Sequence, residues 1–133
     1  MAGAHGGARY GGRVRVLVSL RRRGYLVGDT ITSAGRAALT PPIREADVEA
    51  YLVKQVRARG GDALKFTSPG RRHVPDRLVT APSGGVVLVE VKAPGQKPRV
   101  AQVREHMRLR AAGFVVVVVD SFDAVDATVK RFL

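Results

Sequence analysis

The sequence predicts an α/β domain in which helices flank a mixed β-sheet, preceded by a short basic extension. Three observations support this fold class. The chain has 133 residues, the length of one ordinary domain. A Pro41-Pro42 break separates an irregular first part from a regular second part. After that break, helix and strand patterns follow one another in the order α-β-β-β-α-β-α.

Three segments after the break carry apolar residues at helical spacing. They are residues 44–59, 99–112 and 122–131. Glycines follow the first two segments, at Gly60-Gly61 and Gly113, where helices commonly end. Ser121 is the expected N-cap of the third segment, because its hydroxyl can accept a hydrogen bond from a free backbone amide.

Four further segments read as strands, bounded by turn signals and rich, in the last two, in β-branched residues. They are residues 63–67, 76–81, 86–91 and 114–120. A Pro-Ser-Gly-Gly stretch joins the second and third segments as a hairpin turn. The fourth segment is mostly valine, so we expect both of its faces to be buried in the sheet.

Residues 1–42 form a basic extension rich in Gly and Arg, and residues 43–133 form the main domain. Residues 1–12 are expected to be disordered because they are Gly-rich. Residues 20–39 resemble the end of a winged-helix domain, without the helices that normally come first. The extension is therefore either a winged-helix remnant or a poorly ordered basic arm.

The chain is strongly basic, with 23 Lys and Arg residues against 11 Asp and Glu residues. This excess favours a nucleic-acid partner, although an Arg-rich composition is also typical of a GC-rich genome. Cysteine is absent, which excludes disulfides, thiolate zinc sites and cysteine nucleophiles. The longest apolar run is too short to span a bilayer and no signal peptide is recognisable. We therefore expect a cytoplasmic protein with no membrane partner.

A carboxylate and an amine share one face of the predicted strand 86–91. Strand alternation places Glu90 and Lys92 together, and hairpin pairing brings Asp76 near Glu90. Adjacent carboxylates repel each other unless a divalent cation joins them, and oxygen atoms are the ligands that Mg²⁺ prefers. We therefore expect Asp76, Glu90 and the backbone carbonyl of Val91 to bind Mg²⁺ or Mn²⁺.

The two longer helices offer further groups. Glu45 and Glu49 lie on one side of the first helix, and one of them is expected to reach the metal. Glu49 is preferred because it heads the apolar stripe. Gln102 lies on the second helix and can point towards the site, whereas His73 and His106 are expected to be ordinary surface residues. Each signal alone is common in proteins, but their combined order indicates an active site.

Pro75-Asp76 followed by Glu90-Val91-Lys92 resembles the motif of the PD-(D/E)xK nuclease superfamily. The surrounding sequence, GGDALKFTSPGRRHVPDRLV and then GGVVLVEVKAPGQKP, is similar to the VRR-NUC family of virus-type replication-repair nucleases. The resemblance covers about residues 43–131. It implies a restriction-endonuclease-like core for this part of the chain.

The resemblance also implies residue roles. Asp76 and Glu90 would bind the metal, Lys92 would be the catalytic lysine, and Gln102 would be the glutamine that follows the ExK strand. His73 stands where the family usually has glycine, so we expect an altered loop shape or substrate contact rather than lost chemistry.

The implied activity is metal-dependent DNA cleavage in phage or in repair. Such enzymes recognise DNA structure, for example branched DNA or Holliday junctions, and often act as homodimers. The metal would activate phosphate and water, while Lys92 positions the water and offsets developing charge. Arg71, Arg72 and Arg77 flank the site and are expected to hold phosphates.

Two alternatives come from other functional classes. The first is a non-catalytic DNA-binding protein that keeps the nuclease fold as a scaffold. The intact set of Asp76, Glu90 and Lys92 argues against it. The second is a transcription regulator built on the extension, which is weaker because half of the winged-helix fold is missing.

Overall fold

The computed structural model describes residues 19–27 and 30–133. It divides the chain into two compact units, with the division between Pro42 and Ile43. The expectation of disorder for residues 1–12 lies outside the described residues. Within the described part, no helix is long and apolar enough to cross a membrane.

The first unit contains a minimal hairpin and a short helix. Strands β1 (Leu26–Val27) and β2 (Thr30–Ile31) pair antiparallel, and α2 (Ser33–Leu39) follows them. The Thr32 hydroxyl caps α2 by accepting a hydrogen bond from the Gly35 backbone N–H at 3.0 Å. The first unit thus holds two paired strands followed by a capped helix.

The second unit has the predicted order of elements, and each boundary lies within two residues of its expected position. The elements are α3 (Glu45–Ala58), β3 (Asp62–Lys65), β4 (Arg77–Thr80), β5 (Val86–Val91), α4 (Val100–Ala111), β6 (Val115–Val119) and α5 (Phe122–Phe132). The strands form a mixed sheet in the order β3-β4-β5-β6, in which only β5 and β6 are parallel. The predicted mixed α/β fold is confirmed.

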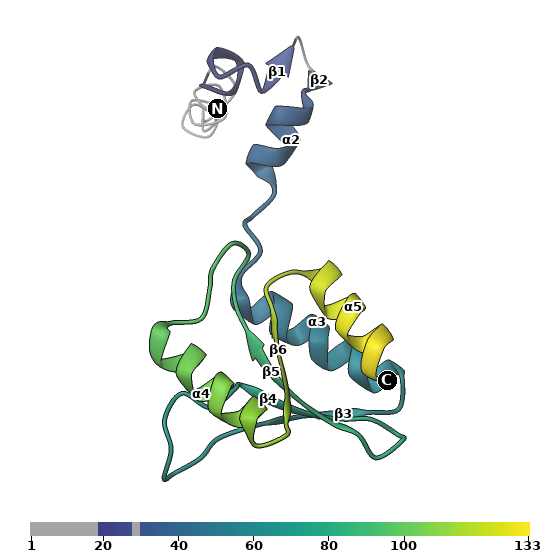
Figure 1. Ribbon diagram of the computed structural model, residues 1–133. Coiled ribbons are helices and arrows are strands. Elements are labelled where there is room, and N and C mark those ends of the chain that lie inside the picture. Colours follow the sequence, from purple (N-terminus) through teal and green to yellow (C-terminus); the bar gives the residue numbers. More distant parts are fainter. Residues whose placement is uncertain (1–18, 28–29) are drawn as a thin grey trace, which may run out of the picture. The chain divides into compact units, whose positions relative to one another are not determined.

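Helices cover both faces of this sheet (Figure 1). On one face, α3 and α5 pack on alternate valines of β5 and form the larger core, with Val48, Leu52 and Val56 of α3 fully buried. On the other face, Leu109 of α4 packs on Leu88 and a few neighbours in a smaller cluster. The two sides of β5 therefore face different environments.

Strand β6 is only partly buried on each of its two faces, so the expectation of burial on both faces holds only in part. Val116 and Val119 are buried, whereas Val115 and Val118 are exposed. The reason is topological: β6 lies at the edge of the sheet, and only β5 pairs with it among the described residues. A run of valines signals a buried strand but does not show where the sheet ends.

Gly61 provides a test of the close approach between α3 and the sheet. A Cβ atom at this position would lie 2.4 Å from the Thr80 carbonyl oxygen and 2.7 Å from Leu133 Cδ2. Gly61→Ala should therefore lower the free energy of unfolding by about 1–3 kcal/mol, measured by urea denaturation. Gly70→Ala is the matched control, because nothing lies within 4 Å of the place that its added methyl group would take. Equal stability of the two variants would contradict this packing.

Candidate active site

Glu90 is the centre of the candidate site. It lies near the end of β5 and has 0% exposed surface. Its neighbours Val89 and Val91 project into the larger core, so Glu90 projects to the face that α4 covers. A buried carboxylate costs several kcal/mol unless other groups compensate its charge and its lone pairs. Its partners therefore decide how this end of the sheet is built.

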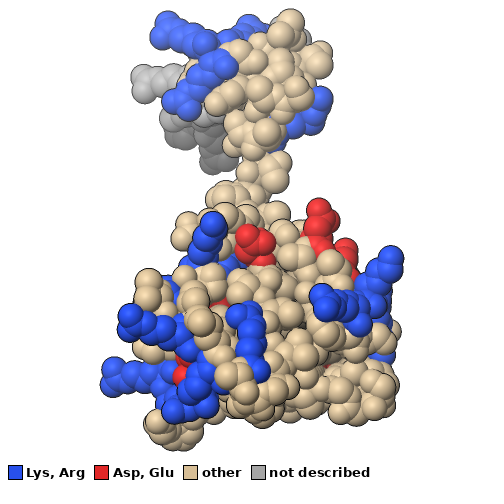
Figure 2. Space-filling view, in the orientation of Figure 1, with Lys and Arg blue, Asp and Glu red and all other residues tan. Residues whose placement is uncertain are grey.

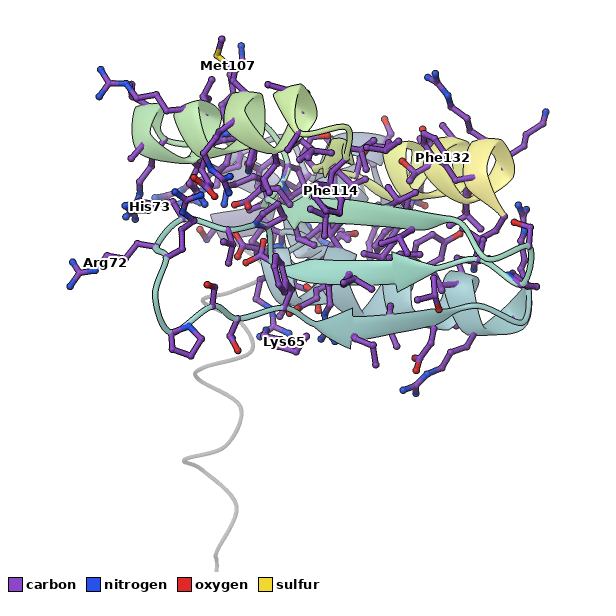
Figure 3. The ribbon with its side chains drawn as sticks, turned by 60° about the horizontal axis from the view of Figure 1, so that its bottom comes forward. Lys65, Arg72, His73, Met107, Phe114 and Phe132 are labelled. Atoms are coloured by element: carbon purple, nitrogen blue, oxygen red, sulfur yellow. The ribbon has the colours of Figure 1, made fainter. Side chains whose placement is uncertain are left out.

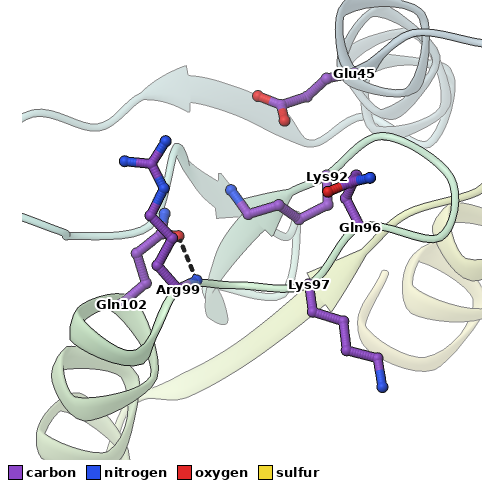
Figure 4. A pocket seen from close by; sticks show the side chains of 6 residues that line it. All are labelled: Glu45, Lys92, Gln96, Lys97, Arg99 and Gln102. Atoms are coloured by element: carbon purple, nitrogen blue, oxygen red, sulfur yellow. Dashed lines mark hydrogen bonds between the residues drawn. The ribbon is translucent and has the colours of Figure 1, made fainter.

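Two side chains donate hydrogen bonds to Glu90 Oε1. Lys92 Nζ lies 2.5 Å away, and Gln102 Nε2 on the first turn of α4 is the second donor. The carbonyl oxygen of Gln102 accepts from the Arg99 backbone N–H at 2.9 Å (Figure 4). One amide group thus joins the start of α4 to the buried carboxylate.

Asp76 is held at the same end of the sheet. The register pairs Arg77 with Val89, so Asp76 lies opposite Glu90 when the pairing is extended by one residue. Directly opposite residues of antiparallel strands share a face. Asp76 Oδ2 accepts a hydrogen bond from the Val91 backbone N–H at 2.8 Å. The structure therefore places Asp76 and Glu90 opposite each other on the same face of the sheet.

A pocket of about 330 Å³ opens beside these residues (Figure 4). Its lining side chains are Glu45, Lys92, Gln96, Lys97, Arg99 and Gln102. Lys92 and Gln102 contact the buried carboxylate and also line the pocket. A molecule bound in the pocket can therefore contact the Lys92 amine, whereas Glu90 lies behind the Lys92 side chain.

Basic side chains surround this region. Figure 2 shows Lys and Arg over much of the side of the second unit on which α4 lies in Figure 1. Arg72 reaches into solvent from the loop before β4 (Figure 3). Arg71 is half exposed, with its Nε 3.9 Å from Glu105 Oε1. Both side chains are available at the surface for an anionic partner.

The comparisons with known proteins identify the family. No family model matches the sequence. The chain is 58% identical to "Putative nuclease p44" of Acyrthosiphon pisum secondary endosymbiont phage 1 over 81 residues, which are 61% of this chain and 87% of that protein. A solved structure described as "VRR_NUC domain" matches with a TM-score of 0.62 and 38% identity, covering 67% of this chain and 97% of that one. The chain belongs to the VRR-NUC family of nucleases.

In this VRR-NUC protein, Glu49 does not join the cluster around Glu90. Glu49 Oε1 accepts hydrogen bonds from Lys65 Nζ at 3.0 Å and from Arg77 Nε at 2.8 Å. These cations lie on β3 and β4 at positions that face α3, on the side of the sheet opposite Glu90. We therefore correct the preference for Glu49 as a metal ligand. Of the two helix acids, Glu45 is the one that lines the pocket.

Arg77 does not have the position expected of a phosphate-binding residue. Its Nη1 donates to the Ala63 carbonyl at 3.0 Å while its Nε contacts Glu49. Only 19% of the side chain is exposed. The guanidinium therefore holds α3 against β3 and β4 and is not presented to a phosphate. Besides Lys92, the fold places two cations at the pocket that sequence reasoning did not select, Arg99 and Lys97.

His106 is buried, so the expectation of a surface position is wrong. Only 1% of it is exposed, and its Nε2 lies 3.4 Å from Glu90 Oε2. The signal that could have found it is helical spacing, because His106 lies one turn after Gln102 on the same face of α4.

The loop residue His73 keeps a backbone conformation that glycine favours. Its φ is 65°, in the left-handed region, where a side chain is disfavoured. The glycine that the resemblance implies at this position would adopt this conformation without strain. The VRR-NUC loop before β4 therefore adopts a glycine-like turn here despite the histidine, and Figure 3 shows the imidazole at the molecular surface.

The oxygen atoms present suit a hard divalent cation. Asp76 and Glu90 supply carboxylates, and Glu90 Oε2 is buried without a hydrogen-bond partner among the described residues. Within the same residues, no group of three or more His, Asp or Glu side chains is close enough to hold a metal ion. The carboxylates of Asp76 and Glu90 are the acidic side chains that this face of the sheet offers to such an ion.

The ion pairs of Glu49 predict a pH-dependent contribution to stability. Burial favours the neutral carboxyl, but the hydrogen bonds and charges of Lys65 and Arg77 outweigh it and lower the pKa of Glu49. Glu49→Gln should therefore lower the free energy of unfolding by about 1–3 kcal/mol at neutral pH. The wild-type advantage should disappear as the pH falls below the ordinary Glu pKa of 4.5 and through the lower folded value.

Urea unfolding of both proteins at neutral and acidic pH measures this difference. Urea is preferred to guanidinium because it does not screen ion pairs. Glu45→Gln is the control, because Glu45 is exposed and should change stability little. A difference between wild type and Glu49→Gln that persists unchanged in acid would contradict the assignment.

Proposed function

We propose that this protein is a Mg²⁺- or Mn²⁺-dependent DNA endonuclease that hydrolyses phosphodiester bonds and selects its substrate by DNA structure. The observation that carries the proposal is the convergence of Asp76, Glu90 and Lys92 beside an open pocket. Membership of the VRR-NUC family supports nuclease chemistry. The formal net charge of +12 supports a polyanionic substrate.

We assign the cation to Asp76 and Glu90, with the Val91 carbonyl and Glu45 as further oxygen donors. When bound, such an ion activates a phosphate group and an attacking water molecule. Glu45 is included because its helix start lines the same pocket as Lys92. Glu49 is excluded because Lys65 and Arg77 occupy its carboxylate.

The protein's own groups divide the remaining work. Lys92 places its ammonium group in the pocket wall, where it can orient the water and offset negative charge on the phosphate. Glu90 fixes the Lys92 amine by accepting its hydrogen bond. Gln102 fixes Glu90 in turn. Productive geometry therefore depends on side chains that are already ordered before a substrate binds.

Phosphate groups next to the cleaved bond would contact Arg99 and Lys97 at the pocket. Arg71 and Arg72 would extend the contact along the DNA backbone. Contacts of this kind hold the phosphate backbone and carry no base sequence. Recognition of DNA shape, such as a branch or a Holliday junction, follows more naturally from this arrangement than recognition of a base sequence.

The alternative is a non-catalytic DNA-binding protein that keeps this fold. One observation favours it: Glu90 is completely buried, and two donors already occupy its Oε1. A bound metal would have to share a carboxylate that the protein itself satisfies in part. Substitution of Lys92 distinguishes a nuclease from a non-catalytic DNA-binding protein, because only the nuclease needs the Lys92 amine for a reaction.

The proposed function also includes a role for the first unit and a homodimeric state. We assign residues 1–42 as an accessory DNA-binding segment, because Arg21, Arg22 and Arg23 lie next to its hairpin. A homodimer would present two pockets to the two strands of a branched DNA.

Lys92→Ala should abolish cleavage while DNA binding persists. The Lys92 amine is needed at the phosphate group that reacts, whereas most of the DNA backbone is held by other side chains. Purified protein is incubated with branched, flapped and linear DNA of equal length, with Mg²⁺, with Mn²⁺ and with chelator. We expect wild-type cleavage only with an added ion, faster on branched DNA. Asp76→Ala should be inactive as well.

Several outcomes decide between the functions. Cleavage that is unchanged in both variants would refute the site. Binding without cleavage by the wild-type protein under all these conditions would support the scaffold alternative. Lys54→Ala is the matched control, because Lys54 is an exposed lysine on the outer side of α3, far in sequence from the cluster.

Lys97→Ala/Arg99→Ala should weaken DNA binding and flatten its dependence on salt. Each lost phosphate contact reduces the magnitude of the negative slope of log affinity against log salt concentration by about 1. Lys130→Ala/Arg131→Ala in α5 removes the same charge elsewhere and is the control. Fluorescence anisotropy with inactive Lys92→Ala protein measures binding without cleavage. Equal slopes for the two double variants would exclude a specific role for the pocket cations.

A further inference from the structure

We propose that His106 is a positioning residue that donates a hydrogen bond from its Nε2–H to Glu90 Oε2. It would hold the carboxylate through the oxygen that Lys92 and Gln102 do not contact. The structural part of this inference is independent of the activity. Its effect on cleavage rests on the proposed nuclease function.

The contact is between two buried atoms that lack other partners. His106 is 1% exposed and Glu90 is 0% exposed. Within the described residues, His106 Nε2 and Glu90 Oε2 are the buried side-chain polar atoms that have no hydrogen-bond partner. They lie 3.4 Å apart. A small rotation of the imidazole brings this separation into the ordinary hydrogen-bond range.

Solvation energetics decide which ring nitrogen carries the proton. A bare Nε2 would place its lone pair against a carboxylate lone pair, and both acceptors would stay buried and unsatisfied. A buried polar group without a partner is costly, and more so when it is charged. The Nε2–H tautomer satisfies both atoms at once. The geometry therefore points to this tautomer.

The placement on α4 distinguishes His106 from a histidine that only fills space. Gln102 and His106 are one helical turn apart, so they project from the same face of the helix. Gln102 reaches Glu90 Oε1 and His106 reaches Glu90 Oε2. One rigid helix thus presents a donor to each oxygen of one carboxylate. An apolar residue at position 106 would fill the same volume but leave Oε2 unsatisfied.

This arrangement has a consequence for a carboxylate that binds a cation. A carboxylate oxygen has two lone pairs, so Oε2 can accept from His106 and still bind a metal. Groups that hydrogen-bond to metal-ligating carboxylates orient them, and their loss typically costs about 10–100-fold in metal affinity or activity. His106 would act through Glu90 without touching the substrate.

The first experiment compares His106→Leu with His106→Gln. Leucine resembles histidine in volume but has no donor, whereas the glutamine amide can place N–H near the Nε2 position. We expect His106→Leu to lower kcat by about 10–100-fold and to raise the Mg²⁺ or Mn²⁺ concentration needed for half-maximal activity, with the KM for DNA little changed. His106→Gln should restore most of both. Met107→Leu, at an exposed position of the same helix, is the control.

Two results would overturn the inference. Wild-type activity and metal dependence in His106→Leu would show that the donor is unnecessary. Equal losses in the leucine and glutamine variants, with melting temperatures close to wild type, would indicate packing alone.

The second experiment needs no activity. Two-bond ¹H–¹⁵N NMR of the wild-type protein reports which imidazole nitrogen of His106 carries hydrogen. A protonated Nε2 is expected, and a bare Nε2 would overturn the inference even if the protein cleaves DNA. If no ion supports cleavage, the nuclease proposal fails, while this spectrum still decides the contact. It also decides the question if His106→Leu does not fold.

Discussion

A carboxylate with no exposed surface is the constraint on which this site depends. Glu90 must keep its charge compensated, because an isolated buried anion is far more costly than one with well-placed donors. The donors come from two places: Lys92 continues the same strand, and Gln102 begins α4. The position of α4 is therefore tied to the carboxylate and not only to apolar packing.

The helices on the two faces of the sheet are attached to it by different kinds of contact. Helix α3 buries Val48, Leu52 and Val56 against the sheet, a conventional apolar contact. Helix α4 buries only His106 and Leu109. With so little apolar area to hold α4, its polar contacts to Glu90 carry a larger share of the attachment. Changes in these polar groups should then affect the placement of the helix as well as the chemistry.

Strand periodicity is enough to predict the centre of the site. Alternation puts Glu90 and Lys92 on one face, and the hairpin turn sets the register that brings Asp76 opposite Glu90. Both relations are local in sequence, so a period of two and a short turn determine them. The pairing observed in the structure agrees with each of these steps.

The remaining errors concern contacts that are distant in sequence. The buried stripe of α3 begins at Val48, one position before the predicted Glu49, and a shift of one residue rotates a helix by about 100°. That rotation turns Glu49 towards Arg77 and Lys65, whose positions only the folded sheet determines. His106 lies one helical turn after Gln102, but the sequence alone does not identify its partner. The folded structure is needed to show that Glu90 lies next to it.

The Gln102 amide shows how the binding surface and the buried carboxylate are coupled. Its oxygen accepts from the Arg99 backbone N–H, and its nitrogen donates to Glu90. Arg99 also lines the pocket, and its side chain is exposed. The loop before α4 therefore cannot shift without changing the hydrogen bond that orients Glu90. Because an amide has fixed donor and acceptor ends, the Gln102 side chain can make both hydrogen bonds in only one orientation, and together with Lys92 it connects the pocket wall to the buried carboxylate.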